Sequence, residues 1–416
     1  MLLPLLVVLI VFILIAARRI GSHHVEIWQV MGMGALAVLI TGQISIVDAL
    51  ISINMDVMLF LFGMFVLGVA LEDSGYLLHI SHRIFRHARN GDQVLLLLLF
   101  SAGFASAILM NDTLAIIGTP LVLFLAKVHR MNSKILLLGL AYAVTIGSAM
   151  SPIGNPQNLL IAINGGMEAP FVTFFMILLL PTVANLIVAF VLLKLLFKSD
   201  LECCVIDDQV GQTVLNHRQA RACRISLIIL LLMICVKVIL VSLAIPVDFR
   251  LTYIALASAA PVLLAGPHRF QLLRRVDWKT LIFFAAMFVL MQSVWDSGVF
   301  QALLESTHID IVSIPMIFLF SVTVSQLISN VPLVALYLPL LLHAGAGPVE
   351  LVALAAGSTI AGNLTILGAA SNVIVIQNAE DKADITITLA EFMRVGVPLT
   401  VLNILVYMAF FTLFSW

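Results

Sequence analysis

The sequence has few charged residues. Asp, Glu, Lys and Arg make up only 10% of its 416 positions, whereas 62% are hydrophobic. A water-soluble domain of this length carries about 25% charged residues. Long polar stretches are also missing, because the longest, residues 199–224, is too short to bury a core of its own. The composition therefore excludes a soluble fold and predicts an integral membrane protein.

Other patterns are absent as well. Apolar runs such as residues 94–100 and 225–233 do not alternate with polar residues, which excludes a transmembrane β-barrel. The four cysteines form no Cys-x-x-Cys pair, and there is no Gly-x-Ser-x-Gly elbow and no pair of acids at matching membrane depth. We therefore expect neither an enzyme nor a cofactor, and no nucleic-acid partner.

Hydropathy instead predicts an all-α polytopic membrane protein, since about 20 apolar residues cross a bilayer. Ten full spans are expected near residues 2–17, 25–41, 57–78, 134–163, 171–197, 225–245, 251–266, 280–296, 351–377 and 392–414.

Four apolar segments are too long for one simple crossing. Segments 94–126 and 314–342 each carry polar residues at their middle, and we interpret them as re-entrant hairpins. Segments 134–163 and 351–377 each contain a Gly- and Asn-rich patch, which is typical of a discontinuous helix in a transporter.

The basic residues predict the orientation of the spans. With the N-terminus outside, most Arg and Lys residues from Arg18 to Lys382 fall in or beside cytoplasmic loops, Lys237 falls within a span, and only Arg250 falls in an outside loop. This excess of basic residues on the cytoplasmic side holds only if each hairpin enters and leaves the membrane on the same side. We expect a multi-pass protein of the cell membrane (inner or plasma membrane) with both termini outside. A cleaved signal peptide is the alternative for the apolar N-terminus, which lacks the basic start of such a peptide.

The chain contains an internal repeat. Val57–Leu67 aligns with Thr280–Leu290, and Asn111, Thr145, Gly154, Asn158 and Asn164 correspond to Asn330, Thr359, Gly368, Asn372 and Asn378. The predicted domains are two repeats, 1–198 and 224–416, joined by a cytoplasmic linker, 199–223. Each has five spans, one of them discontinuous, plus one hairpin, so the second repeat is inverted. This plan indicates a secondary transporter, although a channel stays an alternative.

The predicted midplane site is rich in amides. A breaking Asn can cap the new helix, but capping uses only part of what an amide can bind. Helix ends of this kind present free N–H groups, which suit an anion or a neutral ligand rich in oxygen. The candidate substrate-binding residues are Asn111, Asn155, Asn158, Asn330, Asn363, Ser371 and Asn372.

Asp112 is the one carboxylate expected at hairpin-tip depth, and its counterpart in the repeat is Val331. An ionisable group inside a membrane marks an ion or proton pathway by default. Removal from water favours the protonated carboxyl, so we interpret Asp112 as the proton-coupling group. The alternative is a second helix cap beside Asn111.

These motifs resemble those of a known family. Met110–Pro120 resembles the first-hairpin motif of the ArsB arsenite permeases, and Gly362–Val375 is similar to a signature that ArsB shares with the melanosomal P protein. The patch Ser151–Asn158 is of the kind found across the ArsB/NhaD group of the ion transporter superfamily. The resemblance covers nearly the whole chain and implies scaffold and transport elements, and often homodimers.

The resemblance and the scarcity of charge together favour a neutral, hydroxylated substrate. Arsenite at neutral pH is largely an uncharged trihydroxide, so we expect proton-coupled export of trivalent arsenic or antimony by alternating access. The alternatives are proton- or sodium-coupled transport of inorganic or carboxylate anions, and Na⁺/H⁺ antiport. A partner ATPase assists some family members; the chain has no Walker motif, so any ATP use requires another chain.

Overall fold

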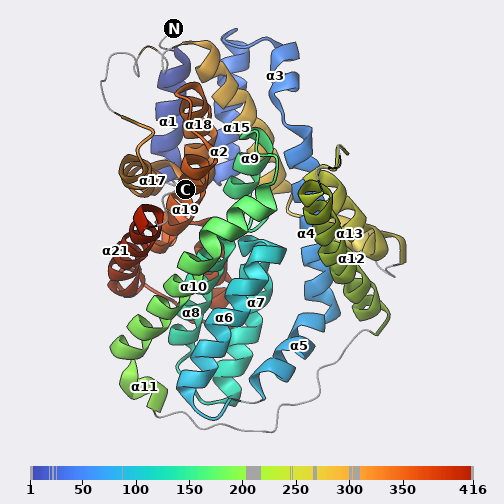
Figure 1. The fold of residues 1–416 in the computed structure, drawn as a ribbon, viewed down its shortest axis with the longest axis vertical. Coiled ribbons are helices and arrows are strands. Elements are labelled where there is room, and N and C mark those ends of the chain that lie inside the picture. The colour runs from blue at the N-terminus through green and yellow to red at the C-terminus, as the bar shows by residue number, and fades with distance from the viewer. Residues whose placement is uncertain are drawn as a thin grey trace.

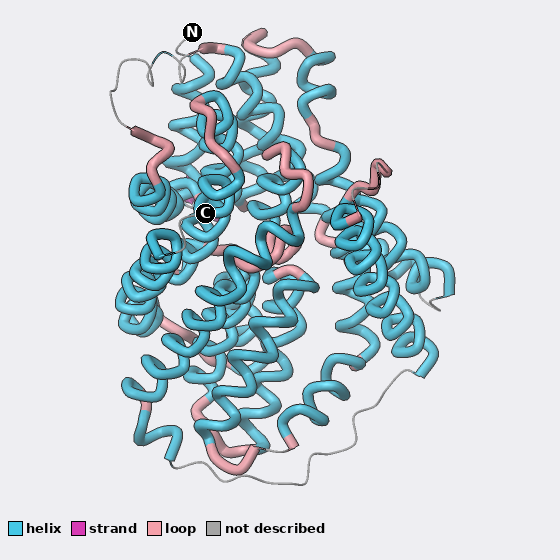
Figure 2. The backbone as a smooth tube through the Cα atoms, viewed as in Figure 1, coloured by secondary structure: helices cyan, strands magenta, loops and turns pink. Residues whose placement is uncertain are grey.

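The structure is a computed structural model that describes residues 3–17, 19–20, 23–24, 26–86, 88–202, 217–243, 245, 247–265, 269–298, 302 and 310–413. Its described elements are almost entirely helical (Figures 1 and 2). The exception is one antiparallel pair of two-residue strands, β1 (Arg19–Ile20) and β2 (His23–His24). The expected all-α fold is thus confirmed.

The helices of the first half run from α1 to α11. They are α1 (Leu3–Ala17), α2 (Ile27–Ile40), α3 (Ile46–Ser52), α4 (Met55–Ser74), α5 (Tyr76–Phe85), α6 (Gly91–Leu109), α7 (Asn111–Val128), α8 (Ser133–Ser148), α9 (Pro156–Asn164), α10 (Pro170–Leu196) and α11 (Lys198–Glu202).

The second half has the same order of long helices. They are α12 (His217–Ser242), α13 (Leu251–Ala265), α14 (Arg269–Arg275), α15 (Trp278–Asp296), α17 (Ile314–Ile328), α18 (Asn330–His343), α19 (Pro348–Ile360), the 3₁₀ turns η1 (Ala361–Asn363) and η2 (Ile366–Gly368), α20 (Ala370–Ala383) and α21 (Leu389–Leu413).

Several bounds differ from the expected ones. The segment expected as span 57–78 is divided at Gly75, whose left-handed φ of 66° ends α4 before the short helix α5 begins. α3 was not expected; Ser45 caps it by accepting from the Asp48 N–H. α12 begins at His217, within the predicted linker. Among the described helices, seven are long and apolar enough to cross a membrane.

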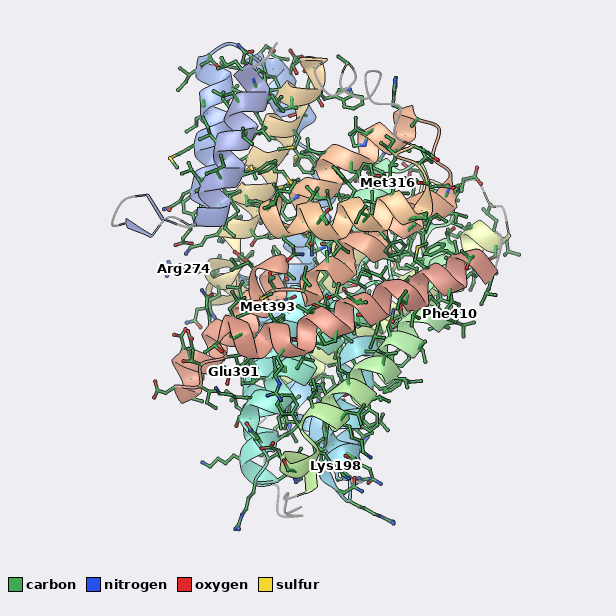
Figure 3. The ribbon with its side chains drawn as sticks, turned by 90° about the vertical axis from the view of Figure 1, so that its left-hand side faces the viewer. Lys198, Arg274, Met316, Glu391, Met393 and Phe410 are labelled. Carbon is green, nitrogen blue, oxygen red and sulfur yellow. The ribbon has the colours of Figure 1, made fainter. Side chains whose placement is uncertain are left out.

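The helices group into two bundles. α1, α2, α4, α12, α13 and α15 pack mainly on one another and are called the scaffold bundle below, whereas α6 to α10 and α17 to α21 form the hairpin bundle. In Figure 1, α4, α12 and α13 stand to one side of α6, α7, α8 and α10. α21 crosses the face of the hairpin bundle from Glu391 to Phe410 (Figure 3).

Close backbone contacts hold the hairpin bundle together. A Cβ atom on Gly147 of α8 would lie 2.1 Å from the carbonyl oxygen of Gly103 on α6. No side chain fits there, so glycine allows the two helices to touch through their backbones, as small residues do in membrane bundles.

Candidate functional site

Each hairpin turns at a single residue with an unusual backbone conformation. Met110 (φ 68°) separates α6 from α7, and Ser329 (φ 72°) separates α17 from α18. The two residues precede Asn111 and Asn330, which correspond in the repeat. A positive φ is uncommon for residues other than glycine. Its occurrence at both turns indicates that the two halves of the repeat share the same backbone geometry at the hairpin tip. The hairpins' return to their own side of a membrane stays a prediction.

The two hairpin tips and the two helix breaks meet at one cavity of about 410 Å³. Four helices begin at its wall: α7 at Asn111, α9 at Pro156, α18 at Asn330 and α20 at Ala370. The opposite wall comes from the scaffold bundle, from the start of α2 and from α15 up to Phe284. We call this space the Asp112 cavity.

Three of these four helices lack a side-chain cap from the residue that precedes them. At the start of α7, however, the Asn111 N–H donates to the Gly154 carbonyl oxygen at 2.8 Å and the Asp112 N–H donates to the Asn111 Oδ1 at 2.9 Å. Asn155 caps α9 by accepting from the Asn158 N–H at 2.8 Å. α7, α18 and α20 follow Met110, Ser329 and Ala369, none of which makes a side-chain cap. The positive ends of the helix dipoles therefore point at the Asp112 cavity, which favours a ligand with oxygen lone pairs.

Asn158 holds the first helix break together. Its Nδ2 donates to the carbonyl oxygens of Ser148 (3.1 Å), Ala149 (3.2 Å) and Ser151 (3.0 Å). Its Oδ1 accepts from the Thr359 hydroxyl at 3.3 Å. The side chain is fully buried, and these bonds use both of its N–H protons and one lone pair of its Oδ1, so it is committed to the protein.

Asn372 repeats this arrangement in the second break. Its Nδ2 donates to the carbonyl oxygens of Gly362 (2.6 Å) and Thr365 (3.4 Å). In the repeat, Gly362 and Thr365 occupy the positions of Ser148 and Ser151. The internal repeat therefore extends to individual hydrogen bonds. The symmetry is incomplete, because the Asn372 Oδ1 has no partner within the described structure.

The predicted site residues separate into two groups. Asn111, Asp112 and Asn330 line the Asp112 cavity. Behind its wall, Ser371 accepts from the Asn111 Nδ2 at 3.4 Å. The remaining residues serve the breaks: Asn155 donates to Ser148 and Thr359, Asn158 and Asn372 brace carbonyls, and Asn363 donates to Asn403.

Unpartnered atoms among the predicted residues are all oxygens. Asp112, Asn330, Asn363 and Asn372 each have a buried Oδ1 without a hydrogen-bond donor in the described chain. Two of these oxygens, on Asp112 and Asn330, belong to residues that line the cavity. A buried acceptor without a partner costs about 1–3 kcal/mol, so a ligand that donates hydrogen bonds would be stabilised here.

The sequence did not identify the charged rim of the cavity. Lys279 donates to both oxygens of Glu26, at 2.8 and 2.7 Å, and this bond lowers the pKa of Glu26 below its usual range. Asp277 lines the same rim and caps α15 by accepting from the Thr280 N–H. The repeat could have identified Asp277 as a helix cap, because Asp277 corresponds to Asn54, which caps α4 in the same way.

Comparison with known proteins identifies relatives along most of the chain. Residues 7–354 match the family model CitMHS, described as citrate transporter. An uncharacterized transporter of Mycobacterium tuberculosis is 29% identical, with 94% of each chain covered. A silicon efflux transporter of Oryza sativa subsp. japonica is 25% identical over 83% of this chain and 84% of its own.

A solved structure shows a related fold. The crystal structure of the Alcanivorax borkumensis YdaH transporter superposes with a TM-score of 0.57 at 14% sequence identity, covering 100% of this chain and 98% of that one. The agreement over full length supports the same overall arrangement of helices.

Proposed function

The chain belongs to the CitMHS citrate transporter family of the ArsB/NhaD superfamily, and we propose that it exports trivalent arsenic or antimony as the neutral trihydroxide in exchange for protons. That it is a multi-pass membrane protein and a secondary transporter, and not an enzyme, follows from the family. The substrate and the coupling ion are the proposal.

The unpartnered oxygens of Asp112 and Asn330 carry the proposal. Arsenous acid has three O–H groups and can donate to both oxygens, while its own oxygens accept from the uncapped starts of α18 and α20. A neutral solute needs no basic side chain, and Lys279 at the rim is already paired with Glu26. Dissolved silicon is also a small neutral hydroxide, and one relative is named for silicon efflux.

Asp112 would couple the solute to protons by competition. An ionised carboxylate accepts a hydrogen bond from the solute, whereas the protonated carboxyl has lost part of that capacity. The substrate favours the ionised form of Asp112 and the proton produces the other form. Each therefore lowers the affinity of the protein for the other. Exchange of one for the other, which is antiport, follows from that competition.

A carboxylate or inorganic anion is the second candidate. The uncapped starts of α18 and α20 favour negative charge, and the family model is described as a citrate transporter. An anion beside Asp112 would bind best when that carboxyl is protonated, because two like charges repel. The anion would then move together with a proton. The direction of proton movement thus separates the two candidates.

A flux experiment with purified protein in liposomes tests the proposal. Arsenite, antimonite, citrate, phosphate and sodium are each supplied under an imposed pH gradient, with protein-free liposomes as the control. We expect arsenite and antimonite to move against the proton flow. Flux of citrate, phosphate or sodium without arsenite flux would refute the metalloid assignment.

The remaining expectations stay proposals of the same kind. They are location in the inner or plasma membrane with both termini outside, the repeat boundaries 1–198 and 224–416, homodimer formation, and a cytoplasmic ATPase partner. Linker residues 203–216 lie outside the described structure.

A further inference from the structure

A second cavity lies at the other end of α15. It has a volume of about 770 Å³ and is lined by Asn54, Leu160, Asn164 and, on α15, residues from Phe288 to Asp296. We call it the Asn164 cavity. The Asp112 cavity uses the start of α15, up to Phe284. One turn of α15 therefore separates the two cavities.

Two helices of the hairpin bundle, α9 and α18, also line both cavities, each with different residues. α9 lines the Asp112 cavity with Pro156 and Gln157 and the Asn164 cavity with Leu160 and Asn164. α18 also lines both, the first with Asn330 and Val331 and the second from Ala335 to Leu342. Both cavities thus lie along one boundary, between α15 of the scaffold bundle and two helices of the hairpin bundle.

The internal repeat relates the two cavities to each other. Asn54 and Leu160 of the Asn164 cavity correspond to Asp277 and Ile374, which line the Asp112 cavity. Asn164 corresponds to Asn378, which follows the lining residue Gln377. In an inverted repeat, corresponding residues face opposite sides of the membrane.

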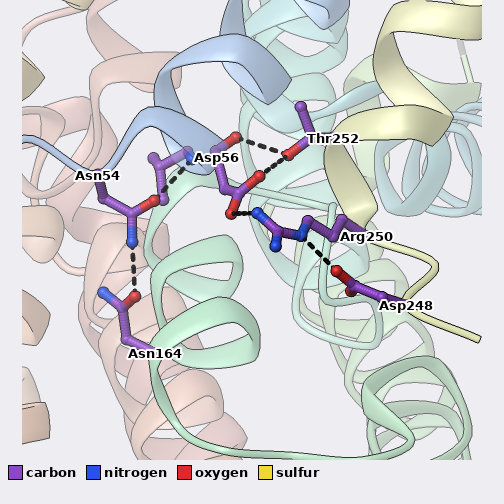
Figure 4. Close-up of polar contacts among 7 residues, drawn as sticks. Asn54, Asp56, Asn164, Asp248, Arg250 and Thr252 are labelled. Carbon is purple, nitrogen blue, oxygen red and sulfur yellow. Dashed lines mark hydrogen bonds and ion pairs between the residues drawn. The ribbon is translucent and has the colours of Figure 1, made fainter.

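At the Asn164 cavity, one hydrogen bond joins the bundles. Asn54 Nδ2 donates to Asn164 Oδ1 at 2.7 Å, while Asn54 Oδ1 caps α4 by accepting from the Val57 N–H at 3.1 Å (Figure 4). Asn54 is therefore held by its own helix and reaches across to the end of α9.

The scaffold side of this contact is anchored to α13. Asp56, two residues after Asn54, accepts from the Thr252 hydroxyl at 2.8 Å and pairs with Arg250 at 3.2 Å (Figure 4). Arg250 also pairs with Asp248 at 2.9 Å. The start of α4 is thus fixed within the scaffold bundle, so motion of α9 must break the Asn54–Asn164 bond.

The corresponding groups at the Asp112 cavity are not joined. Asp277 caps α15 through the Thr280 N–H at 3.0 Å, as Asn54 caps α4. Within the described residues, no hydrogen bond links Asp277 to Asn378. The two corresponding positions are therefore joined by a hydrogen bond at one end of α15, between Asn54 and Asn164, and are not joined at the other, between Asp277 and Asn378.

We propose that Asn54–Asn164 and Asp277–Asn378 are alternating latches at the two ends of one substrate path, and that the Asn164 cavity is the far vestibule of that path. In the described state the first latch is closed and the second is open. In the opposite state, Asn378 donates to the Asp277 carboxylate, the first latch opens, and the Asn164 cavity receives the substrate. This inference rests on the proposed transport function but not on the identity of the solute.

Cysteine accessibility tests the latches without any substrate. A reporter cysteine is placed in each cavity, Val373→Cys in the Asp112 cavity and Leu336→Cys in the Asn164 cavity, with the four natural cysteines replaced by alanine. The rate of labelling by a water-soluble maleimide is measured on the purified protein. Asn164→Ala and Asn378→Ala remove one latch each at corresponding positions.

We expect the two latch variants to have opposite effects. Asn164→Ala should speed labelling at residue 336 and slow it at 373, so that the ratio of the two labelling rates rises about fivefold, the factor that corresponds to one neutral hydrogen bond. Asn378→Ala should slow labelling at 336. Ser52→Ala, which lines the Asn164 cavity but bonds only to Ala49 within α3, is the matched control and should change neither rate.

Equal effects of the two latch variants, or no effect of either, would overturn the proposal. Near-unchanged thermal melting of each variant shows that a changed rate is not unfolding. Opposite labelling shifts together with absent arsenite flux would leave the latches standing and refute only the substrate. Arsenite flux with unshifted labelling would refute only the latches.

Discussion

The two corresponding amides Asn158 and Asn372 should differ in their importance for stability. Both brace the carbonyl groups of a helix break, but Asn158 donates to three carbonyls and accepts from Thr359, whereas Asn372 donates to two and its Oδ1 is free of protein donors in the described chain. Replacement by alanine removes these bonds and leaves the buried carbonyls with fewer donors.

The size of the effect follows from the number of bonds. The Asn158 Nδ2 has two protons to share among three carbonyls, and with the Thr359 bond this amounts to three hydrogen bonds. At about 1 kcal/mol net for each buried bond, Asn158→Ala should lower the free energy of unfolding by about 3 kcal/mol. Asn372→Ala loses one short bond and one of 3.4 Å, so its loss should be about 2 kcal/mol or less.

Titration of the purified protein with SDS, followed by far-ultraviolet circular dichroism, measures the free energy of unfolding of both variants. Each variant serves as the control for the other, because residue type, burial and position in the repeat are matched. A loss for Asn372→Ala that equals or exceeds the loss for Asn158→Ala would refute this account of the breaks.

Two further predictions concern packing and charge. Gly147→Ala should lower the free energy of unfolding by about 1–3 kcal/mol, because its Cβ would meet Gly103, whereas Gly32→Ala, with nothing within 4 Å, should not; equal effects in thermal melts would contradict this. Lys279 lowers the pKa of Glu26, so the stability from this exposed pair is present above pH about 4.3 and is lost as the pH falls through the lowered pKa. The difference in melting temperature between wild type and Lys279→Met should therefore be small at pH 7 and vanish in acid, and a difference that grows in acid would be inconsistent with it.

The sequence was sufficient for the features that depend on local pattern. Apolar length predicted the helices, and the polar interruptions predicted the turns at Met110 and Ser329. The repeat predicted that Asn158 and Asn372 occupy corresponding places, and their hydrogen bonds agree. The repeat was visible because both halves retain residues that the breaks require.

The direction in which each amide points could not be predicted. Asn155, Asn158 and Asn330 are all amides at a helix break or a hairpin tip, yet of these three only Asn330 lines the cavity with an unpartnered oxygen. The outcome depends on packing between distant segments, such as the Asn155 bond to Thr359. The rim residues Glu26 and Lys279 were missed because their contact also joins segments far apart in the chain.

The role of Asp112 is the central claim, and proton-coupled arsenite flux tests it most directly. Wild-type protein and Asp112→Asn are compared in liposomes loaded with arsenite, with and without a pH gradient. We predict that the gradient accelerates wild-type flux and that Asp112→Asn still exchanges arsenite but no longer responds to the gradient. An unchanged response of Asp112→Asn to the gradient would contradict the account.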